Sequence, residues 1–355
     1  MSHPAYPHQA QADLPGVGFA AMRQLILAEA QSAKLAVLED SEGHLTVETA
    51  HGLIGLRPGA ATEAAGMVAA RDPRWLFILK GAVIQQMRQA LPAVAEAMRW
   101  SDGDVAGTLP PNFQFVRVVE VTALGPVFLR VTLEGEDLSS YGDASIHFRL
   151  LQPPKDTTIE PEWPSVAPNG STRWPEGPGA PHKPVYTVRA VDHRANRLVT
   201  DVFLHDGGRT TAWAQEVMAG GRERTVVGLV GPLGGGLLAA ERVFLASDET
   251  GFPAAARLLE NLPEGASGTV LLEAEEGADC AYPIEAPAGF SVRWLARARG
   301  ERLGEAALAA LPGHLDGTVW FAGKKCEARQ LREAAKAAGL PADRTRISGF
   351  WTAPS

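Results

Sequence analysis

The segment Pro184-Val-Tyr-Thr-Val-Arg189 places an aromatic ring, a hydroxyl group and a cation in one short run of β character. A flat, anionic cofactor such as a flavin needs these three groups, because its ring packs on an aromatic face, its edge takes hydrogen bonds and its phosphates pair with a cation. The same run also suits an ordinary half-buried strand. In combination with the segments described next, we assign to cofactor binding Tyr186, Thr187, Val188 and Arg189.

A second segment, residues 205–214, carries two glycines followed by two threonines. The glycines allow a tight turn, and the residues from Thr210 onward have helical spacing. The N-terminus of a helix offers free N–H groups and a positive dipole end, so this segment suits a flavin pyrophosphate. The alternative is a capped helix without a ligand. The residues that we assign to this site are His205, Gly208, Thr210 and Thr211.

Two further segments follow predicted strands near the end of the chain. A strand over residues 242–247 is followed by an acidic turn, and a strand over residues 318–323 is followed by two lysines. Nucleotides bind at the carboxyl ends of strands in open parallel sheets. We therefore assign both turns and a tryptophan of the last strand to cofactor binding, with a solvated turn and surface lysines as the alternative. The assigned residues are Asp248, Glu249, Thr250, Gly323, Lys324 and Trp351.

Short β segments fill the middle of the chain, which predicts an antiparallel β-barrel or sandwich. The expected strands are residues 115–123, 127–134, 147–151, 185–191 and 198–204. Residues 152–183 interrupt them with many prolines and glycines, so we expect a surface loop there, held to the body of the protein by Trp163 and Trp174.

Strands alternate with helices beyond residue 240, which implies βαβ units and a parallel sheet. The expected strands are residues 242–247, 268–273, 292–296, 318–323 and 346–350, and the expected helices are 252–262, 305–311 and 327–338. The sequence therefore predicts a flavin-binding barrel over residues 113–236 and an α/β nucleotide-binding domain over residues 240–355.

The N-terminal part has a different pattern. Residues 1–15 lack hydrophobic periodicity and are interpreted as a disordered tail. Residues 16–105 are interpreted as a small α+β domain of unknown role, and His44 and His51 in it are interpreted as surface or turn residues without a third metal ligand. The expected elements are helices over 19–33 and 84–100, the second kinked by Pro92, and strands over 34–38, 45–49 and 53–57.

Composition restricts the function classes. The chain has 355 residues, a net charge of −8 and a pI near 5.7, which argues against a general nucleic-acid binder. Its two cysteines, Cys280 and Cys326, cannot form a disulfide framework or a four-thiolate cluster. We recognise no signal peptide and no apolar run long enough to span a membrane. We expect a cytoplasmic protein with no bound metal, and a monomer rather than an oligomer.

Residues from about 113 to 355 resemble the siderophore-interacting, ferric-siderophore reductase family, which comprises flavoproteins related to ferredoxin reductases. Several stretches in order carry the resemblance: residues 116–133, His147-Phe-Arg-Leu150, Tyr186-Thr-Val-Arg-Ala-Val-Asp192, residues 205–214, Gly231-Pro-Leu-Gly234, residues 246–254, Ala322-Gly-Lys-Lys325 and Ser348-Gly-Phe-Trp351. The resemblance implies FAD as cofactor, NADPH or NADH as electron donor and a ferric siderophore as substrate. The first hundred residues resemble only faintly a small domain of unknown function that is sometimes joined to this family.

The resemblance also implies roles for single residues. Tyr186 would pack on the isoalloxazine ring and Thr187 would bond the ring system. Pro184 stands where the family has a phosphate-binding arginine, so the cation would come from Lys183 or Arg189. Ser247 stands where the family usually has glycine. Lys324 stands where it commonly has glutamate, and the added positive charge favours the 2′-phosphate of NADPH.

The implied reaction transfers a hydride to the flavin and then single electrons to Fe(III), and Fe(II) leaves its chelator because it binds hard oxygen donors less tightly. Candidate cations for an anionic ferric chelate are Arg149, Lys183 and Arg189. Two alternatives remain open at this point. One is a general flavin reductase or diaphorase with another acceptor, and the other is a flavin-free chelate-binding protein derived from the family.

Overall fold

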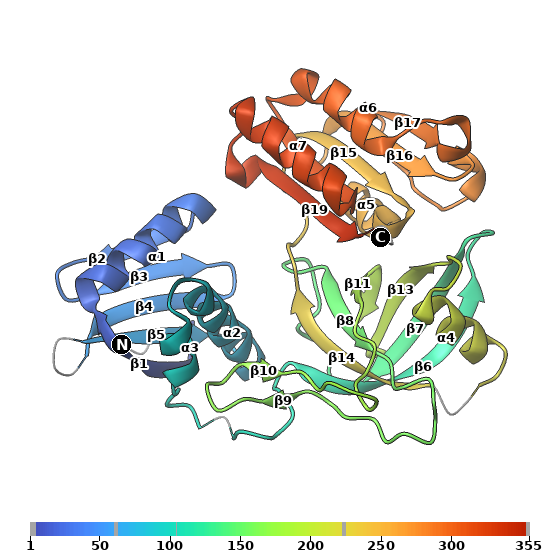
Figure 1. Cartoon of the computed structure of the whole chain (residues 1–355). Helices are drawn as coiled ribbons and strands as arrows, with labels where there is room; N and C mark the ends of the chain where they lie inside the picture. Colours follow the sequence, from blue (N-terminus) through green and yellow to red (C-terminus); the bar gives the residue numbers. More distant parts are fainter. Residues whose placement is uncertain (1–4, 60–62, 104, 222–224, 353–355) are drawn as a thin grey trace. The chain divides into compact units, whose positions relative to one another are not determined.

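The computed structural model describes residues 5–59, 63–103, 105–221 and 225–352 (Figure 1). The chain divides into two compact units, each formed from two stretches of sequence. Unit 1 comprises Met1–Gln114 and Pro153–Pro181, and unit 2 comprises Phe115–Gln152 and His182–Ser355.

Unit 1 is built on a five-stranded antiparallel sheet in the order β1-β5-β4-β3-β2. Its strands are β1 (His8–Gly18), β2 (Ala36–Asp40), β3 (Leu45–Thr49), β4 (Gly52–Pro58) and β5 (Glu63–Ala70), and its helices are α1 (Phe19–Ala33), α2 (Pro73–Ala90) and α3 (Pro92–Ala97). One face of the sheet packs on the helices, because side chains at every second position, such as Ala12, Leu45 and Leu56, share a core with Met22 of α1 and Ile84 of α2.

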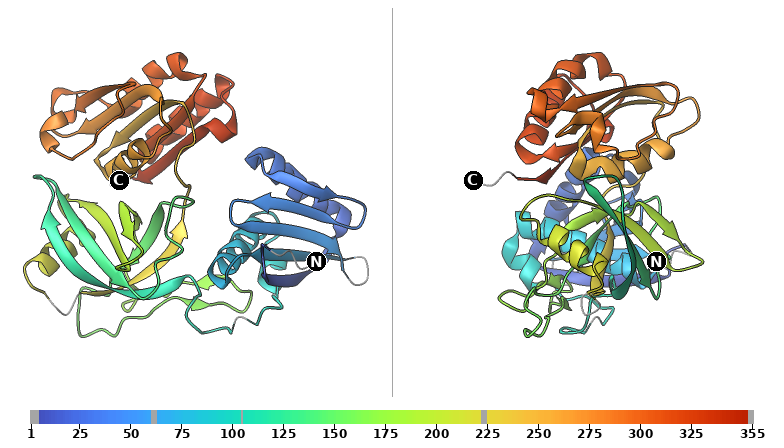
Figure 2. Two further views of the ribbon diagram at one scale, coloured as in Figure 1. Left: turned by 180° about the vertical axis from the view of Figure 1, so that it is seen from behind. Right: turned by 90° about the vertical axis from the view of Figure 1, so that its right-hand side faces the viewer.

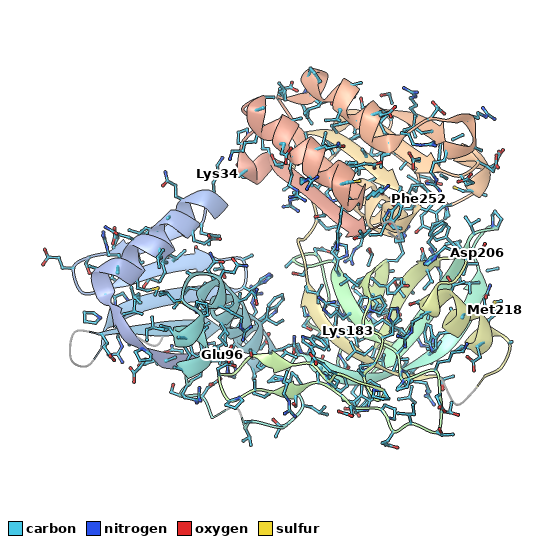
Figure 3. The ribbon with its side chains drawn as sticks, in the orientation of Figure 1. Lys34, Glu96, Lys183, Asp206, Met218 and Phe252 are labelled. Carbon is cyan, nitrogen blue, oxygen red and sulfur yellow. The ribbon has the colours of Figure 1, made fainter. Side chains whose placement is uncertain are left out.

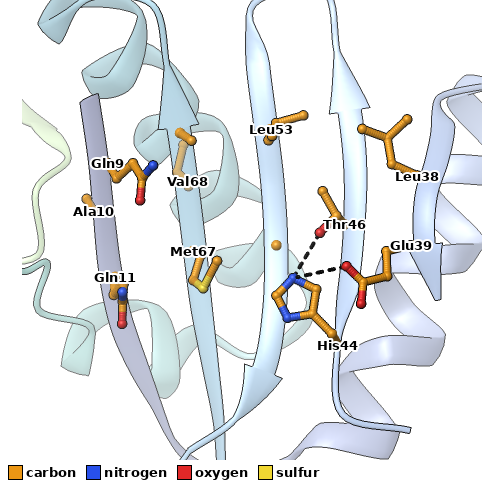
Figure 4. Close-up of a pocket in the computed structure, with 12 residues that line it drawn as sticks. Gln9, Ala10, Gln11, Leu38, Glu39, His44, Thr46, Leu53, Met67 and Val68 are labelled. Atoms are coloured by element: carbon orange, nitrogen blue, oxygen red, sulfur yellow. Dashed lines mark hydrogen bonds and ion pairs between the residues drawn. The ribbon is translucent and has the colours of Figure 1, made fainter. Parts of the chain in front are cut away.

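The opposite face of this sheet carries polar side chains. His44 Nε2 lies 3.0 Å from Thr46 Oγ1 and 3.9 Å from Glu39 Oε2, beside a cavity of about 200 Å³ (Figure 4). His51, in the turn between β3 and β4, stacks on Trp75 with ring centroids 3.6 Å apart. No group of three or more potential metal ligands occurs among the described residues.

Two predictions for unit 1 are wrong. Residues 8–15 are no disordered tail, because β1 pairs with β5 from His8↔Ala70 to Leu14↔Ala64; residues 1–4 lie outside the described part of the chain. Two of the four buried residues of β1, Ala10 and Ala12, are alanines, whose small side chains give little periodic signal. The single kinked helix over residues 84–100 is instead two helices, because Pro92 lacks an N–H group and begins α3 rather than continuing α2.

The proline-rich segment Pro153–Pro181 belongs to unit 1, which corrects its assignment to the barrel domain. It forms two short paired strands, β9 (Ser165–Val166) and β10 (Thr172–Arg173). The ring of Trp163 packs against Phe113 at 5.8 Å, and Asn169 Nδ2 donates to the Ala95 carbonyl at 3.0 Å. These contacts fix a segment that has almost no secondary structure.

The first half of unit 2 is a seven-stranded antiparallel sheet in the order β11-β8-β14-β6-β7-β13-β12 (Figure 1). Its elements are β6 (Phe113–Ala123), β7 (Phe128–Gly135), β8 (His147–Leu151), β11 (Val185–Thr187), β12 (Ala190–Asp192), β13 (Arg197–Phe203), α4 (Arg209–Met218) and β14 (Val226–Leu233). Trp213 of α4 enters the barrel core together with Phe148 and Leu198.

The predicted strand over residues 185–191 is two strands, and the change of partner between them closes the sheet. β11 pairs with β8, whereas β12 pairs with β13 at the other end of the strand order. Between them Val188 N donates to the Ile146 carbonyl and Arg189 N to the Val199 carbonyl, both at 2.8 Å. The predicted flavin segment is therefore the seam of a closed β-barrel.

The second half of unit 2 is a parallel sheet in the order β17-β16-β15-β18-β19. Its strands are β15 (Arg242–Asp248), β16 (Ser267–Ala274), β17 (Phe290–Ala296), β18 (Thr318–Lys324) and β19 (Thr345–Trp351), and its helices are α5 (Phe252–Glu260), α6 (Leu303–Ala310) and α7 (Lys325–Ala337). Every predicted strand and helix of this domain is present within a few residues. Short 3-10 turns complete it at Glu249–Gly251, Gly277–Cys280, Arg297–Arg299, Leu311–His314 and Ala342–Arg344.

Helices cover both faces of this parallel sheet (Figures 1 and 2). On one face, Phe252 and Leu258 of α5 pack with Val243 and Leu272 (Figure 3). On the other face, α6 and α7 pack against Phe321 and its neighbours. The carboxyl ends of the strands are left for the site, as in other doubly wound sheets.

Candidate functional site

A cavity of about 890 Å³ lies in unit 2, with walls from the barrel and from the parallel-sheet domain. The barrel contributes Tyr186, Thr187 and Phe203, and the parallel sheet contributes Glu249 and Thr250 together with much of β19. A volume of this size is within the range of small-molecule and cofactor sites. The cavity therefore joins two segments that the sequence assigned to cofactor binding.

Tyr186 presents its ring to the cavity while its hydroxyl group is buried and hydrogen-bonded to Thr210. Burial raises the pKa of Tyr186 to about 12, so the hydroxyl stays protonated. Thr187 is buried, its hydroxyl lies at the cavity wall, and its carbonyl accepts a hydrogen bond from the Thr200 hydroxyl at 2.8 Å. The ring and the hydroxyl that were predicted to face a flat cofactor thus both border the cavity.

His147 is a cavity residue that the sequence analysis did not select. Its Nδ1 lies 3.4 Å from Thr187 Oγ1, and its ring meets the ring of Phe350 edge-on at 5.8 Å. Burial lowers the pKa of His147 to about 4, so the imidazole is neutral at physiological pH. A Cβ on Gly234 would lie 2.6 Å from His147 Cδ2, and Gly234 has φ +77°, so glycine is required beside this ring.

The segment predicted to hold the pyrophosphate is only partly at the cavity. His205 lines it, whereas the two threonines of the segment have partners inside the protein. Thr211 Oγ1 accepts from His205 N at 3.2 Å, and Thr210 Oγ1 donates to Gln152 Oε1 at 3.3 Å. A Cβ on Gly208 would lie 2.7 Å from the His205 ring, so this glycine sets the approach of the loop to α4.

Arg189, predicted as a phosphate cation, is directed to α5. Its guanidinium donates to both carboxylate oxygens of Glu260, one of them at 2.8 Å. Arg257 of α5 in turn donates to the Val188 carbonyl and, at 3.0 Å, to the Gly142 carbonyl. Val188 and Arg189 therefore tie the seam of the barrel to the parallel-sheet domain, and neither lines the cavity.

The predicted nucleotide residues gather at the carboxyl ends of β15, β18 and β19. Thr250 Oγ1 donates to Asp248 Oδ1 at 2.5 Å, and Trp351 Nε1 donates to Asp248 Oδ2 at 2.6 Å. Burial raises the pKa of Asp248 to about 6. Gly323 lies against the same carboxylate, because a Cβ there would be 3.1 Å from Asp248 Oδ2. The side chains brought together at this edge thus come from three strands.

Two charges at this edge have different surroundings. Lys324 Nζ lies 5.7 Å from the centroid of the Trp351 ring, a cation–π geometry. Glu249 is buried and bonded to Arg297 Nη1 at 2.7 Å, and Arg297 also binds Glu273 at 2.9 Å. The negative charge of Glu249 is therefore balanced by the guanidinium of Arg297, which reduces the repulsion between Glu249 and an anionic ligand.

The predicted substrate cations Arg149 and Lys183 lie together, and Lys183 (Figure 3) directly precedes the cavity-lining residues Pro184 and Val185. Arg149 Nη1 donates to the Lys183 carbonyl at 3.1 Å. Neither lines the cavity itself. A cation that does line it is Arg346 of β19, whose Nη1 donates to the Gly236 carbonyl at 2.8 Å and whose pKa burial lowers.

These residues fit a flavin nucleotide. The cavity offers the ring of Tyr186, the hydroxyl of Thr187 and the guanidinium of Arg346, and glycine backbone at 234–236 replaces side chains along one wall. A Cβ on Gly235 would have Arg346 Nη1 at 3.7 Å as its nearest neighbour, so the wall is open there. The Gly-Gly-Gly run was the sequence signal for this wall; Arg346 and His147 had no local signal.

A closed barrel with a cofactor-sized cavity, followed by a parallel-sheet domain whose strand ends face it, defines a flavin reductase type of protein. The sequence model described as "Siderophore-interacting FAD-binding domain" matches residues 117–236, and the one described as "Siderophore-interacting protein" matches residues 240–354. The chain belongs to the siderophore-interacting protein family and contains that family's FAD-binding domain.

Similar proteins include characterised reductases. The chain is 28% identical over 253 residues to the NADPH-dependent ferric-chelate reductase of Escherichia coli, covering 68% of this chain and 94% of that protein. It is 32% identical over 202 residues to the ferric vibriobactin reductase ViuB of Vibrio cholerae, covering 55% and 69%. The structure of a siderophore utilization protein from T. fusca matches with a TM-score of 0.54 at 28% identity, covering 71% of this chain and 97% of that one. The siderophore-interacting protein SipS from Aeromonas hydrophila shares the fold, with a TM-score of 0.55 at 20% identity over 69% of this chain and 93% of that one.

Proposed function

We propose that unit 2 is an FAD-containing, NAD(P)H-dependent reductase of ferric siderophores, which releases their iron as Fe(II). The observation that carries the proposal is the cavity of about 890 Å³ between the barrel seam at Tyr186 and the carboxyl ends of the parallel strands. This places a flavin-sized site next to the edge where a nicotinamide nucleotide binds in doubly wound sheets. The printed functions of the Escherichia coli and Vibrio cholerae relatives support the same reaction.

The side chains position a flavin and tune its surroundings. The Tyr186 ring supports the flat ring system, and the Thr187 hydroxyl is within reach of a polar ring edge, beside the neutral His147. Arg346 faces the same cavity and neutralises phosphate charge. When bound, FAD supplies the hydride acceptor and the single-electron donor that no protein side chain provides. His205 borders the phosphate side of the cavity.

The nucleotide side is formed by Asp248, Thr250 and Gly323 with Lys324 and Trp351. Lys324 lies over the Trp351 ring at the end of β18, and its positive charge favours a nucleotide with an extra phosphate. We infer that the electron donor is NADPH, with NADH as the weaker donor. No described helix is long and apolar enough to cross a membrane. We propose a monomeric protein in the cytoplasm, where both free cysteines remain reduced.

The ferric substrate docks beside the barrel wall near Arg149 and Lys183. A ferric chelate with a net negative charge is attracted by two adjacent cations, which raise the affinity for it. Alanine variants of these two residues should weaken binding of anionic ferric chelates and flatten its dependence on salt, while NADPH oxidation with a neutral artificial acceptor is unchanged. An unaltered affinity for anionic chelates in both variants would remove this role.

The proposal is tested on the purified full chain. A yellow protein, or one that takes up one equivalent of added FAD, is expected. NADPH should bleach the flavin without oxygen, and a ferric siderophore should restore its colour while an Fe(II) chelator records product. A colourless protein that binds no FAD would refute the proposal. Reoxidation by quinones or dyes but by no ferric chelate would instead identify a general diaphorase.

The preference for NADPH over NADH is tested by one substitution with a matched control. Replacing Lys324 by glutamate, the residue common in the family at this position, removes the cation and adds a like charge for a phosphate. The ratio of kcat/KM for NADPH over NADH should fall, on the order of tenfold. Lys325→Glu on the neighbouring helix residue serves as the control for net charge.

A further inference from the structure

Unit 1 contains a second cavity, which lies between helices α1 and α2 above the helix-covered face of its sheet and has a volume of about 520 Å³. Both helices and strands β3, β4 and β5 contribute to its walls. The family sequence models begin at residue 117, so neither of them accounts for this cavity. It lies wholly within described residues of one unit.

Gly66 on the floor of the cavity leaves space that a side chain would otherwise occupy. Ala12, Gly66 and Leu56 are neighbours across three strands on the helix-covered face. A Cβ on Gly66 would have no atom nearer than the Ala12 carbonyl oxygen at 3.8 Å, so the space above it is unfilled. The unfilled space above this floor amounts to about 520 Å³.

The walls are apolar and adaptable. Met22 of α1 and Met87 of α2 line the cavity, together with aliphatic side chains such as Ile54 and Val83. Methionine side chains are flexible and polarisable, so they adjust to ligands of different shape. Burial of an apolar molecule against such walls is favourable without any directed polar contact.

The side chains at the rim of the cavity determine which charge on a ligand is favourable. Gln86 Nε2 of α2 donates to Glu29 Oε2 of α1 at 3.2 Å, and both side chains are exposed. Two cations near these residues in sequence are engaged elsewhere, since Arg23 pairs with Asp40 at 2.6 Å and Arg88 with Glu96 at 2.9 Å. The rim therefore offers a carboxylate and an amide, which accept and donate hydrogen bonds but repel an anionic head group.

We propose that unit 1 binds an uncharged apolar small molecule, with a hydroxyl or amide head at Glu29 and Gln86 and its apolar body against Gly66, Met22 and Met87. The cavity volume corresponds to a drug-sized ligand rather than to a solvent molecule. Fatty-acid anions are excluded as the preferred ligand because their carboxylate would approach Glu29. This site is independent of the flavin cavity and does not rest on the reductase activity of unit 2.

The test uses the full chain, saturated with FAD so that the cavity of unit 2 is filled. The neutral dye Nile red should bind with one equivalent of bright fluorescence. Decanol should displace it, and decanoate should do so at least tenfold less well. A dye signal that disappears on FAD loading would assign the binding to unit 2 and overturn the proposal, as would equal competition by decanol and decanoate.

Two filling variants locate the site. Gly66→Val places a side chain in the floor, and its backbone is compatible because Gly66 has no positive φ; dye affinity should fall at least tenfold. Ala82→Leu narrows the rim at an exposed helix position that tolerates a larger residue, and affinity should fall several-fold. Ala21→Leu, also exposed on a helix but outside the cavity, should bind like the wild type. Wild-type binding in both filling variants would refute the site.

A separate variant tests the effect of the negative charge of Glu29. Glu29→Gln keeps the shape of the rim and removes the negative charge. Decanoate affinity should then rise, on the order of fivefold for a charge pair near contact distance in water, while decanol affinity is unchanged. Unchanged decanoate affinity would contradict the assignment of Glu29 to the head-group position. Thermal unfolding of each variant shows whether unit 1 is still folded.

Discussion

Removing the aromatic face of Tyr186, while keeping an apolar side chain there, should weaken FAD binding. The side chain has two functions in the structure, because its ring borders the cavity and its hydroxyl is bonded to Thr210 inside the barrel. Tyr186→Leu removes the π face and leaves a smaller apolar side chain. Stacking of a ring on an aromatic side chain contributes about 1–3 kcal/mol, so the Kd for FAD should rise roughly five- to hundredfold.

Tyr186→Phe is the matched control, since it keeps the ring and removes only the buried hydroxyl. Loss of the hydrogen bond to Thr210 should lower the free energy of unfolding by about 1 kcal/mol and leave the Kd for FAD within about twofold. The Kd is measured by quenching of free FAD fluorescence at fixed ionic strength. Equal FAD affinity in Tyr186→Leu and wild type would refute the role of the ring. Equal weakening in both variants would assign the contribution to the hydroxyl instead.

Three further changes test the surroundings of the site. Because burial raises the pKa of Asp248 to about 6, its protonation stabilises the fold fully below about pH 4, and this contribution is lost as pH rises through about 6. The wild type should therefore lose about 1.5 kcal/mol more stability between pH 5 and pH 8 than Asp248→Asn, and parallel urea-unfolding profiles would contradict this. Tyr282 Oη donates to the buried Asp201 carboxylate at 2.6 Å, so Tyr282→Phe should cost about 1.5–3 kcal/mol of stability, whereas an unchanged urea midpoint would show that the bond contributes little. Arg257→Met leaves the buried Val188 carbonyl without this donor and should cost about 2–4 kcal/mol by denaturant titration, and a cost under about 0.5 kcal/mol would show that the contact is dispensable.

The parallel-sheet domain was the part of the fold most accurately predicted. Its central strands β15 and β18 contain continuous apolar runs such as Val243–Ala246, and both faces of these two strands are buried. Such runs are easily recognised, because a strand that is buried on both faces carries apolar residues at consecutive positions. The alanine-rich strand β5 and the strand β1, whose first two buried residues are alanines, escaped prediction because alanine is compatible with helix, strand and loop.

The candidate site was predicted less completely, because several of its residues have contact partners that are distant in the sequence. Tyr186 and Thr187 could be selected from one short segment, and both line the cavity. Arg189 was a plausible phosphate ligand by local reasoning, but its carboxylate partner Glu260 lies 71 residues away. Arg346 reaches the cavity only because β19 is placed beside β18, a pairing that no local pattern specifies. The role of a side chain whose partner is distant in sequence can be predicted only when the fold is known.

The segment Pro153–Pro181 has a consequence for how this gene can be cut and joined. It is encoded between two barrel strands, yet it completes the other unit, where Asn169 bonds the Ala95 carbonyl and Gly170 lies against the Trp100 ring. A fragment ending at residue 114 would lack these contacts, so it is not a transferable module. A fragment truncated at residue 114 would expose the Trp100 ring that this segment covers. No single cut in the gene separates the two units intact, because each unit is formed from two separate stretches of the sequence.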